Sequence, residues 1–290
     1  MADTVGMQDI RGENISKVIT VLANAEYVFK QLVNVETSNK WKETYYKEAA
    51  ADLTGGTGSA IEGVPRNAAF PSVEVGWTLA SSYHLKHGAQ TNISWEDVIT
   101  DEIDVMQRSM IKVARAISKS VDINIWNTLT ENQTPSTINT LPLTVGYEWD
   151  STTIANRDPI QDILNAKKLL YEDNYNPDRN GFLVLNPKDY ANILGNANVR
   201  NAGQFYTDDV TRNGKVGFIL GLKVLVSNNV TADKAAVIIG GECGTWKSAA
   251  PLTSVVIEDK GLGYTLRSWE VGCCQLKNPQ AVCLITNTAA

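Results

Sequence analysis

The segment from Trp95 to about Leu129 constrains the fold most, because it has the pattern of a single, unusually long amphipathic helix. Its apolar residues recur at spacings of three and four, which is the period of an α-helix. Ser94 and Asp97 resemble a capping box, and acidic residues precede basic ones, as the helix dipole favours. A helix of about nine turns is well above the average length. The sequence therefore predicts one helix over this whole segment.

Two opposite faces are expected on this helix when residues are placed 100° apart. The apolar face contains Ile99, Ile103, Met106, Met110, Val113, Ile117 and Val121. The polar stripe opposite contains Asp97, Asp101, Asp104, Arg108, Lys112, Arg115 and Lys119, and it changes sign halfway. One interpretation is a solvated face supported by pairs such as Asp104 with Arg108. The other is a contact with another subunit, or a basic strip that faces inward.

A long hairpin with a glycine-rich tip is expected between Trp41 and Ser94. Its two flanks are rich in strand formers, and one of them alternates through Val73, Val75, Trp77 and Leu79. The tip contains Gly55, Gly56, Gly58 and Gly63. Because the tip has few large apolar side chains, little would hold it in place in a monomer. Contacts from outside the hairpin are therefore expected.

The regions on either side of these two segments predict a helix and then an α+β region. Apolar spacing favours a helix from Ile15 to Val33 with Asn14 as its N-cap, although the strand formers in VITVL compete with it. A second helix is expected from Asp158-Pro159 to about Asp173, and a short one after Asn186-Pro187. Strands are expected at 182–185, 223–226, 236–239, 254–258, 263–271 and 281–285. The fold class is therefore α+β.

Composition excludes several classes of protein. Of the 290 residues, 43% are hydrophobic and 20% are charged, which is typical of a globular protein and excludes disorder. With 26 basic and 32 acidic residues the net charge is -6, so the whole chain repels nucleic acid and anionic membranes, and only a local patch could attract them. No targeting segment and no run of about 18 apolar residues is found. We expect a soluble protein made in a cytosol, with no membrane contact.

Residues for catalysis, cofactor binding or metal binding are not expected. The two histidines, His84 and His87, are three apart on an expected strand and would point to opposite faces as ordinary polar residues. The sequence contains no GxSxG motif, phosphate loop or dinucleotide fingerprint. Adjacent Cys273 and Cys274 fit small buried side chains better than a redox pair. We therefore predict that the protein is not an enzyme and has no cofactor.

The order of elements resembles the major capsid proteins of tailed phages, whose shell fold is named after the coliphage Hong Kong 97. The resemblance covers roughly Trp41 to Asn287. Three short patterns match at the right spacing: an Asn-Pro before a short helix, a Leu-Gly before a strand, and a Pro-x-Ala in the final strand pair. They are Asn186-Pro187, Leu220-Gly221 and Pro279-Gln280-Ala281. One departure is that no coiled-coil scaffold region precedes the expected N-terminal arm.

The resemblance implies a domain plan and a function. By analogy, residues 1–40 are the N-terminal arm, 41–90 the extended loop, 91–150 with 254–290 the peripheral domain with its spine helix, and 151–253 the axial domain. The implied protein self-assembles into the pentamers and hexamers of an icosahedral virion shell in the host cytoplasm and encloses double-stranded DNA. Portal, scaffold or decoration proteins are further possible partners. An encapsulin-type nanocompartment with protein cargo is the related alternative, and an enzyme of unknown type is a third.

Contacts between subunits are expected at two places. The first is the hairpin, through Gly55, Gly56, Gly58, Val73, Val75 and Trp77. The second is the polar stripe, through Asp104, Arg108, Lys112, Arg115 and Lys119. Sign reversal along the stripe suits a neighbouring subunit better than DNA, because the acidic half would repel phosphate.

Overall fold

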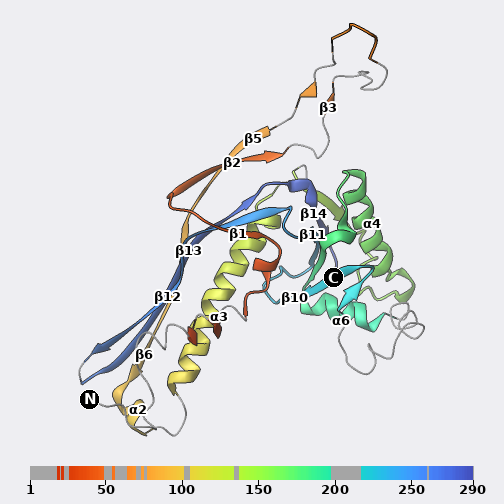
Figure 1. Ribbon diagram of the computed structural model, residues 1–290. Helices are drawn as coiled ribbons and strands as arrows, with labels where there is room; N and C mark the ends of the chain where they lie inside the picture. The colour runs from red at the N-terminus through yellow and green to blue at the C-terminus, as the bar shows by residue number, and fades with distance from the viewer. Residues whose placement is uncertain are drawn as a thin grey trace.

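The structure is a computed structural model that consists of an elongated part, a compact part and a projecting hairpin (Figure 1). It describes residues 18–19, 21–22, 26–48, 54–55, 64–69, 73–74, 77–100, 105–133, 137–196, 217–259 and 261–289. The elongated part is a four-stranded sheet with helices on one face. The compact part is a six-stranded sheet with its own helices. The expected α+β class is confirmed.

The sheet of the elongated part has the strand order β1-β12-β13-β6. Its strands are β1 (Asn34–Thr37), β12 (Gly244–Asp259), β13 (Gly263–Leu276) and β6 (Leu85–Ser94). The two long strands β12 and β13 are antiparallel, and β13 is also antiparallel to β6. The short edge strand β1 is parallel to β12 and more than 200 residues away in sequence, as the pairing of Asn34 with Thr245 shows. Sequence analysis did not predict β1.

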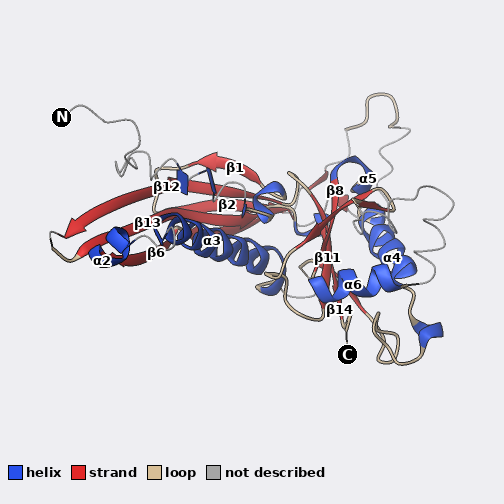
Figure 2. Cartoon of the chain, turned by 90° about the horizontal axis from the view of Figure 1, so that it is seen from below, coloured by secondary structure: helices blue, strands red, loops and turns tan. Residues whose placement is uncertain are grey.

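Helix α3 (Val105–Trp126) lies along one face of this sheet (Figure 2). The expected apolar face is confirmed in its second half, where Val113, Ile117 and Val121 are buried, and Ile125 continues it by one more turn. A π-helical turn, η2 (Asn127–Glu131), ends the segment. The helix therefore presents a buried stripe to the sheet and leaves its opposite face to other contacts.

The prediction of one helix from Trp95 to Leu129 is wrong at its start. Residues Trp95–Thr100 form a separate short helix, α2, at the end of the elongated part that is far from the compact part (Figure 1). Ile99, expected on the buried face, is exposed there. Asp97 and Asp101 are like charges four residues apart, and such pairs destabilise a helix. Asp101, Ile103 and Asp104 lie outside the described residues.

The N-terminal prediction is also only partly correct. Residues 18, 19, 21, 22 and 26 are helical, but the chain then forms the 3-10 turn η1 (Phe29–Gln31) and strand β1. The predicted helix to Val33 thus ends at residue 26. The reason is tertiary: Asp122 of α3 accepts hydrogen bonds from the backbone N–H groups of Val28 and Phe29 at 3.0 and 3.1 Å.

The compact part contains a six-stranded sheet in the order β7-β14-β11-β8-β10-β9. Its strands are β7 (Asn139–Pro142), β14 (Val282–Thr286), β11 (Lys234–Ile239), β8 (Gly181–Leu185), β10 (Leu222–Val226) and β9 (Phe218–Ile219). All five residues of β8 are buried. The prediction of strands here is confirmed, with β7 and β9 added.

Three helices of the compact part begin at an Asx-Pro pair. They are α4 (Pro159–Glu172), α5 (Pro177–Asn180) and α6 (Pro187–Gly195). In each, the side chain of the preceding Asp158, Asn176 or Asn186 accepts a hydrogen bond from a backbone N–H of the first turn. The predictions of α4 and α6 are confirmed. Two further 3-10 turns are η3 (Ile154–Asn156) and η4 (Pro279–Ala281).

Strand pairing divides the chain differently from the expected domain plan. The segment 254–290 was expected in one domain, but β12 and β13 belong to the elongated part and β14 belongs to the compact sheet. Strand β7, expected with the spine helix, also pairs in the compact sheet, with β14. Strand β6 crosses the expected boundary at residue 90. Such long-range pairings are not visible in local patterns.

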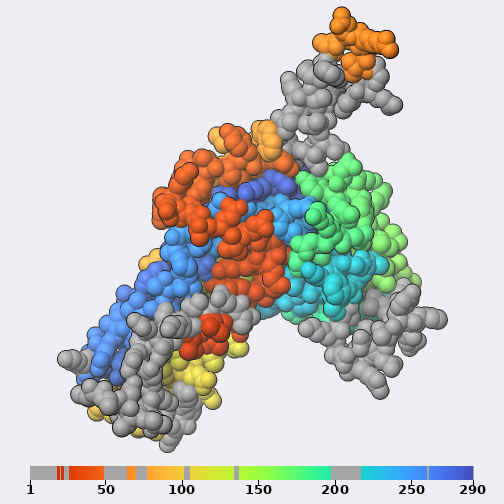
Figure 3. All heavy atoms as spheres, viewed as in Figure 1, coloured from red at the N-terminus to blue at the C-terminus, as the bar shows by residue number. Residues whose placement is uncertain are grey.

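The expected hairpin is present but ends at Tyr83, because β6, which was expected within it, belongs to the four-stranded sheet. Strand β2 (Lys42–Glu48) is antiparallel to β5 (Trp77–Tyr83), and further out β3 (Thr54–Gly55) pairs with β4 (Val73–Glu74). Residues 64–69, drawn in orange, stand apart from the body of the molecule (Figure 3). We call β2 with β5 the hairpin root.

Candidate assembly surfaces

The inner face of the hairpin root is attached to the elongated part. Ser82 of β5 donates from its hydroxyl to the Cys273 Sγ of β13 at 3.4 Å, and Lys47 Nζ donates to Gln133 Oε1 at 2.9 Å. Glu48 N–H donates to the carbonyl of Lys277 at 3.0 Å. Burial raises the pKa of the Tyr45 hydroxyl on the same face. These contacts fix where the root lies on the molecule.

The outer face of the root carries exposed apolar side chains. The register pairs Tyr46 with Leu79, Glu48 with Trp77 and Lys42 with Tyr83, so these residues share one face. Tyr46 and Leu79 are 63% and 64% exposed, and Trp77 and Tyr83 are also more than half exposed. Tyr46 and Trp77 pack edge to face with ring centroids 6.4 Å apart. Such a contiguous exposed apolar face is typical of an interaction surface.

The structure describes only part of the hairpin set predicted to make contacts. Trp77 lies on the outer face of the root, and the backbones of Gly55 and Val73 pair with each other across β3 and β4. Gly56, Gly58 and Val75 lie outside the described residues. Their contacts with another subunit remain a prediction.

The basic half of the polar stripe lies on the exposed side of α3. Arg108, Lys112, Arg115 and Lys119 are all exposed, and we call these four residues the basic strip. Arg115 Nε pairs with Glu26 Oε1 at 3.0 Å, so its carboxylate partner comes from the N-terminal segment of the same chain. Asp104, the expected partner of Arg108, lies outside the described residues.

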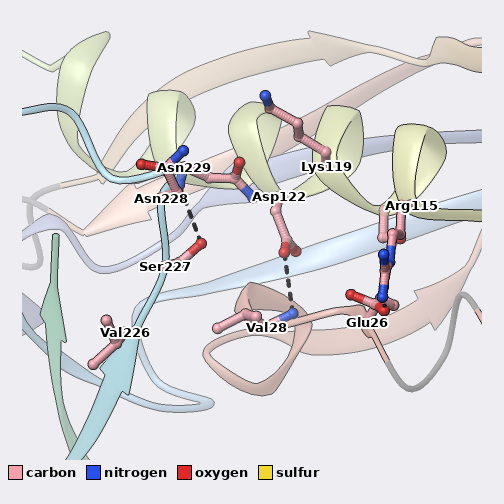
Figure 4. A pocket seen from close by; sticks show the side chains of 10 residues that line it. Glu26, Val28, Arg115, Lys119, Asp122, Val226, Ser227, Asn228 and Asn229 are labelled. Carbon is pink, nitrogen blue, oxygen red and sulfur yellow. Dashed lines mark hydrogen bonds and ion pairs between the residues drawn. The ribbon is translucent and has the colours of Figure 1, made fainter. Parts of the chain in front are cut away.

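A polar pocket of about 340 Å³ lies between α3, the N-terminal segment and the turn that follows β10. Figure 4 shows its lining, with Arg115 and Glu26 at one end and Asn228 and Asn229 at the other. The buried carboxylate in its wall is Asp122, whose pKa is raised to about 6 by burial, although its two backbone hydrogen bonds act in the opposite direction. The pocket wall is thus the junction that holds residues 27–29 against α3.

A buried polar cluster continues this junction toward the sheet. Lys30 Nζ contacts Glu270 Oε1 of β13 at 2.7 Å and lies 3.6 Å from the ring centroid of Tyr27, whose hydroxyl donates to the other Glu270 oxygen. His87 of β6 pairs in register with Glu270, and its Nδ1 lies 2.8 Å from the Ser120 hydroxyl. Burial lowers the pKa of His87. The cluster ties the N-terminal segment to both α3 and the sheet.

The histidines and cysteines of the described residues are all buried. Cys243, Cys273, Cys274 and Cys283 are all buried free thiols, so the prediction of small buried side chains is confirmed for Cys273 and Cys274. His84 and His87, expected as ordinary polar positions on a strand, are both buried. In the described part of the chain, histidine, cysteine and carboxylate side chains form no group of three that could hold a metal ion.

One exposed surface was missed by the sequence analysis. At the end of the elongated part that is far from the compact part, Trp95 and Ile99 of α2 and Leu262 of the β12–β13 turn are exposed apolar side chains. Acidic residues Glu96, Asp97, Glu258 and Asp259 accompany them and are exposed. The assumption of a continuous buried helix placed Ile99 in the core, and the β12–β13 turn at 260–262 had no signal that linked it to α2.

Comparison with known proteins identifies the family. A family model described as phage capsid protein matches residues 81–285. The chain belongs to the phage capsid protein family. The matched range begins near the end of β5 and includes the whole of α3 and nearly all of the strands in both sheets. Members of this family are structural proteins of the capsid.

Solved structures show that this phage capsid protein has the Hong Kong 97-type fold. A virus-like particle from Pyrococcus furiosus is 13% identical at a TM-score of 0.65, with 96% of this chain and 100% of that chain covered. The capsid of cyanophage P-SCSP1u is 11% identical at a TM-score of 0.67, with coverages of 99% and 92%. A structure from Mycobacterium phage Ogopogo is 18% identical at 0.61, with coverages of 99% and 96%. No curated protein matches the sequence.

Among the described helices of this capsid protein, none combines the length and the apolar character needed to cross a membrane.

Proposed function

We propose that this phage capsid protein self-assembles into the pentamers and hexamers of an icosahedral shell, which encloses the double-stranded DNA of a tailed virus. The observation that carries the proposal is the hairpin. Its outer face exposes Tyr46, Trp77, Leu79 and Tyr83, and its distal strands β3 and β4 pair only with each other in the described residues. A contact of this kind with a neighbour, repeated around an axis, closes a ring of subunits.

Shell assembly in the host cytoplasm then uses the two predicted contact sets. The hairpin contacts a neighbour through Gly55, Gly56, Gly58, Val73, Val75 and Trp77. The stripe on the spine helix contacts another through Asp104, Arg108, Lys112, Arg115 and Lys119. Portal, scaffold and decoration proteins are additional partners of the shell. Packaged DNA is enclosed without sequence-specific binding. The net charge of -6 gives the chain as a whole no strong attraction to phosphate.

Electron microscopy of the purified recombinant chain tests assembly directly. We expect closed shells or capsomer rings, with more than about 2,000 Å² buried per subunit, as in obligate interfaces. Deletion of residues 52–64 removes β3 and part of the chain between β3 and β4, and it should abolish particles while the melting temperature of the subunit stays unchanged. A matched control replaces the same residues with a glycine-serine linker of equal length. If the deleted chain still forms normal shells, the hairpin does not carry assembly.

An encapsulin-type shell with protein cargo is the second candidate. The helical residues around Ile19 and Leu22 favour it, because they pack on the core beside α3, as an N-terminal helix on an inner surface would. The contents of particles purified from the native host separate the two functions. Double-stranded DNA supports the virion shell, whereas a co-purifying enzyme without DNA supports the nanocompartment.

A further inference from the structure

The basic strip of α3 carries positive charge that the helix itself does not compensate. The only acidic residue of this helix is Asp122, which is buried and faces the N-terminal segment. Arg108 and Lys112 are four residues apart, and so are Arg115 and Lys119, so the exposed face repeats like-charge pairs that destabilise a helix. Within the described residues, the ion pair of Arg115 with Glu26 is the one that this strip makes. A negatively charged surface from outside the subunit would stabilise the strip.

An acidic surface lies at the end of the elongated part that is far from the compact part. Glu96 and Asp97 of α2 and Glu258 and Asp259 of β12 are exposed, and we call these four residues the acidic end. Asp97 and Asp259 line one hollow of about 440 Å³. Helix α2 lies on the same side of the sheet as α3, so the acidic residues of α2 and the basic strip belong to one side of the molecule (Figure 2).

Apolar residues accompany both charged surfaces. Trp95 and Ile99 are 51% and 58% exposed beside the acidic residues of α2. Val18 and Val21 are 43% and 68% exposed on the N-terminal helical residues, which lie next to α3 in Figure 1 and end at the partner of Arg115. Each surface therefore combines charge with exposed apolar area, and the two surfaces are opposite in sign.

We propose that two copies of this chain pack their elongated parts side by side and antiparallel about a two-fold axis, with the acidic end of each copy on the basic strip of the other. A parallel arrangement places acids against acids and bases against bases. The antiparallel arrangement places opposite charges together at both ends, and each contact is formed twice. The proposal rests on the proposed shell function and supplies a contact between neighbouring capsomers, which ring contacts within one capsomer do not provide.

Packaged DNA is the other polyanion that the basic strip could attract. Phosphate would contact only the four bases, since the acidic residues of α2 lie on the same side and repel it. DNA would also leave Trp95 and Ile99 exposed to water. The second copy accounts for both surfaces, and DNA binding is an alternative outcome of the tests.

Charge exchange tests the pairing. One variant carries Lys112→Glu and Lys119→Glu, which leaves the Arg115–Glu26 ion pair intact. A second carries Glu96→Lys and Asp97→Lys, and a third carries all four substitutions and has the wild-type net charge. We expect the first two to lower the yield of sedimenting particles at least tenfold and the third to restore it to within about twofold of wild type. Circular dichroism of each subunit before assembly shows whether it is folded.

Two results overturn the pairing. The first is normal shell formation by both double variants, and a loss of nucleic acid from such shells would then assign the basic strip to DNA. The second is a folded fourfold variant that assembles no better than the double variants.

A single cysteine tests the two-fold axis. Arg108 is the residue of the basic strip nearest to α2 along the chain, so it is the strip residue expected closest to an axis that lies between the acidic end and the strip. The four native cysteines are buried, so Arg108→Cys introduces the exposed thiol. Under mild oxidation we expect at least fivefold more disulfide-linked dimer than with Gln107→Cys, which is turned by about 100° on the same helix. Equal amounts from the two variants would refute the axis. This test needs no complete shell, so it judges the pairing even if the proposed shell function fails.

Discussion

The compact part and the hairpin root use the same secondary structure in opposite ways. In β8 every side chain is buried, and β10 and β11 flank the strand on both edges within the six-stranded sheet. In β5 the three large side chains, Trp77, Leu79 and Tyr83, are exposed, and β2 is its only paired strand among the described residues. The compact part is therefore stabilised within one subunit. The hairpin leaves apolar area exposed that a neighbouring subunit can bury.

The elongated part lies between these two cases. Its sheet and α3 bury a core around Val113, Ile117 and Leu266, but the N-terminal segment is joined to it largely by the polar groups of Asp122, Lys30 and Glu270. Buried polar contacts of this kind contribute little net stability and mainly fix one arrangement. The three regions thus predict a graded series of mutational effects on the subunit.

The largest effect is expected in the centre of the compact sheet. Leu183 of β8 is fully buried and pairs with Val224 on one side and Val237 on the other. Leu183→Ala leaves a cavity that this tightly paired sheet cannot close, so the free energy of unfolding should fall by about 3 kcal/mol. Urea denaturation of the unassembled subunit measures it. A loss below about 1 kcal/mol would show that the compact part does not depend on its own core.

A smaller effect is expected where the N-terminal segment joins α3. Asp122→Ala leaves the N–H groups of Val28 and Phe29 without their acceptor, but it also removes a carboxylate whose pKa is raised by burial. Because the two effects oppose each other, we expect a loss of about 1.5 kcal/mol. Hydrogen exchange of the amides at 28–33 should become faster. The control is Ser118→Ala, one turn earlier, whose hydroxyl donates only to the carbonyl of Ala114 in the same helix. Unchanged exchange in the Asp122 variant would contradict this account.

The pH dependence of the free energy of unfolding tests the raised pKa of one buried carboxyl group in the compact part, that of Asp189. Asp189 of α6 is buried and accepts a hydrogen bond from the Thr288 hydroxyl at 2.9 Å, and burial, reinforced by Asp233, raises its pKa to about 6. A carboxyl with a raised pKa binds its proton more tightly in the folded state. Its charge therefore destabilises the fold at pH 7, and this cost is relieved as the pH falls from about 7 to about 5.

The comparison with Asp189→Asn isolates this group. Relative to the Asn variant, the wild-type subunit should gain about 1 kcal/mol of stability between pH 7 and pH 5. Thermal melts of both proteins at each pH measure the difference, so the titration of other groups such as His87 cancels. A difference that stays constant with pH, or that changes in the opposite direction, would exclude a raised pKa at Asp189.

Local patterns predicted local structure well and long-range pairing poorly. The Asx-Pro starts of α4 and α6 and the apolar face of α3 from Val113 onward depend on neighbours a few residues away, and these predictions are confirmed. The parallel pairing of β1 with β12 and the place of β14 beside β11 depend on residues far apart in sequence. No short spacing signals them. The capsid fold itself was predicted from the order of elements and short motifs.

The candidate surfaces were also predicted only where they depend on residues close together in sequence. The exposed bases of α3 follow from helical periodicity, whereas the acidic end joins α2 to the end of β12, two segments about 160 residues apart. Sequence analysis missed the end of the helix at residue 26. The cause is Asp122, nearly a hundred residues later, which accepts hydrogen bonds from the N–H groups of Val28 and Phe29. In both cases a tertiary contact decides which side chains are exposed.

The smallest effect on the subunit is expected on the outer face of the hairpin root. Leu79→Ala makes the same chemical change as Leu183→Ala, but Leu79 is 64% exposed and loses little burial. The free energy of unfolding should change by less than about 0.5 kcal/mol. The matched control is Ser81→Ala, an exposed residue on the same face of the same strand. In shell assembly the order reverses: Leu79→Ala should raise the protein concentration needed for particles several-fold, while Ser81→Ala leaves it unchanged. Light scattering over a concentration series measures this threshold. If Leu79→Ala destabilises the subunit as strongly as Leu183→Ala, the outer face is packed within the subunit, and the contrast between the two regions does not hold.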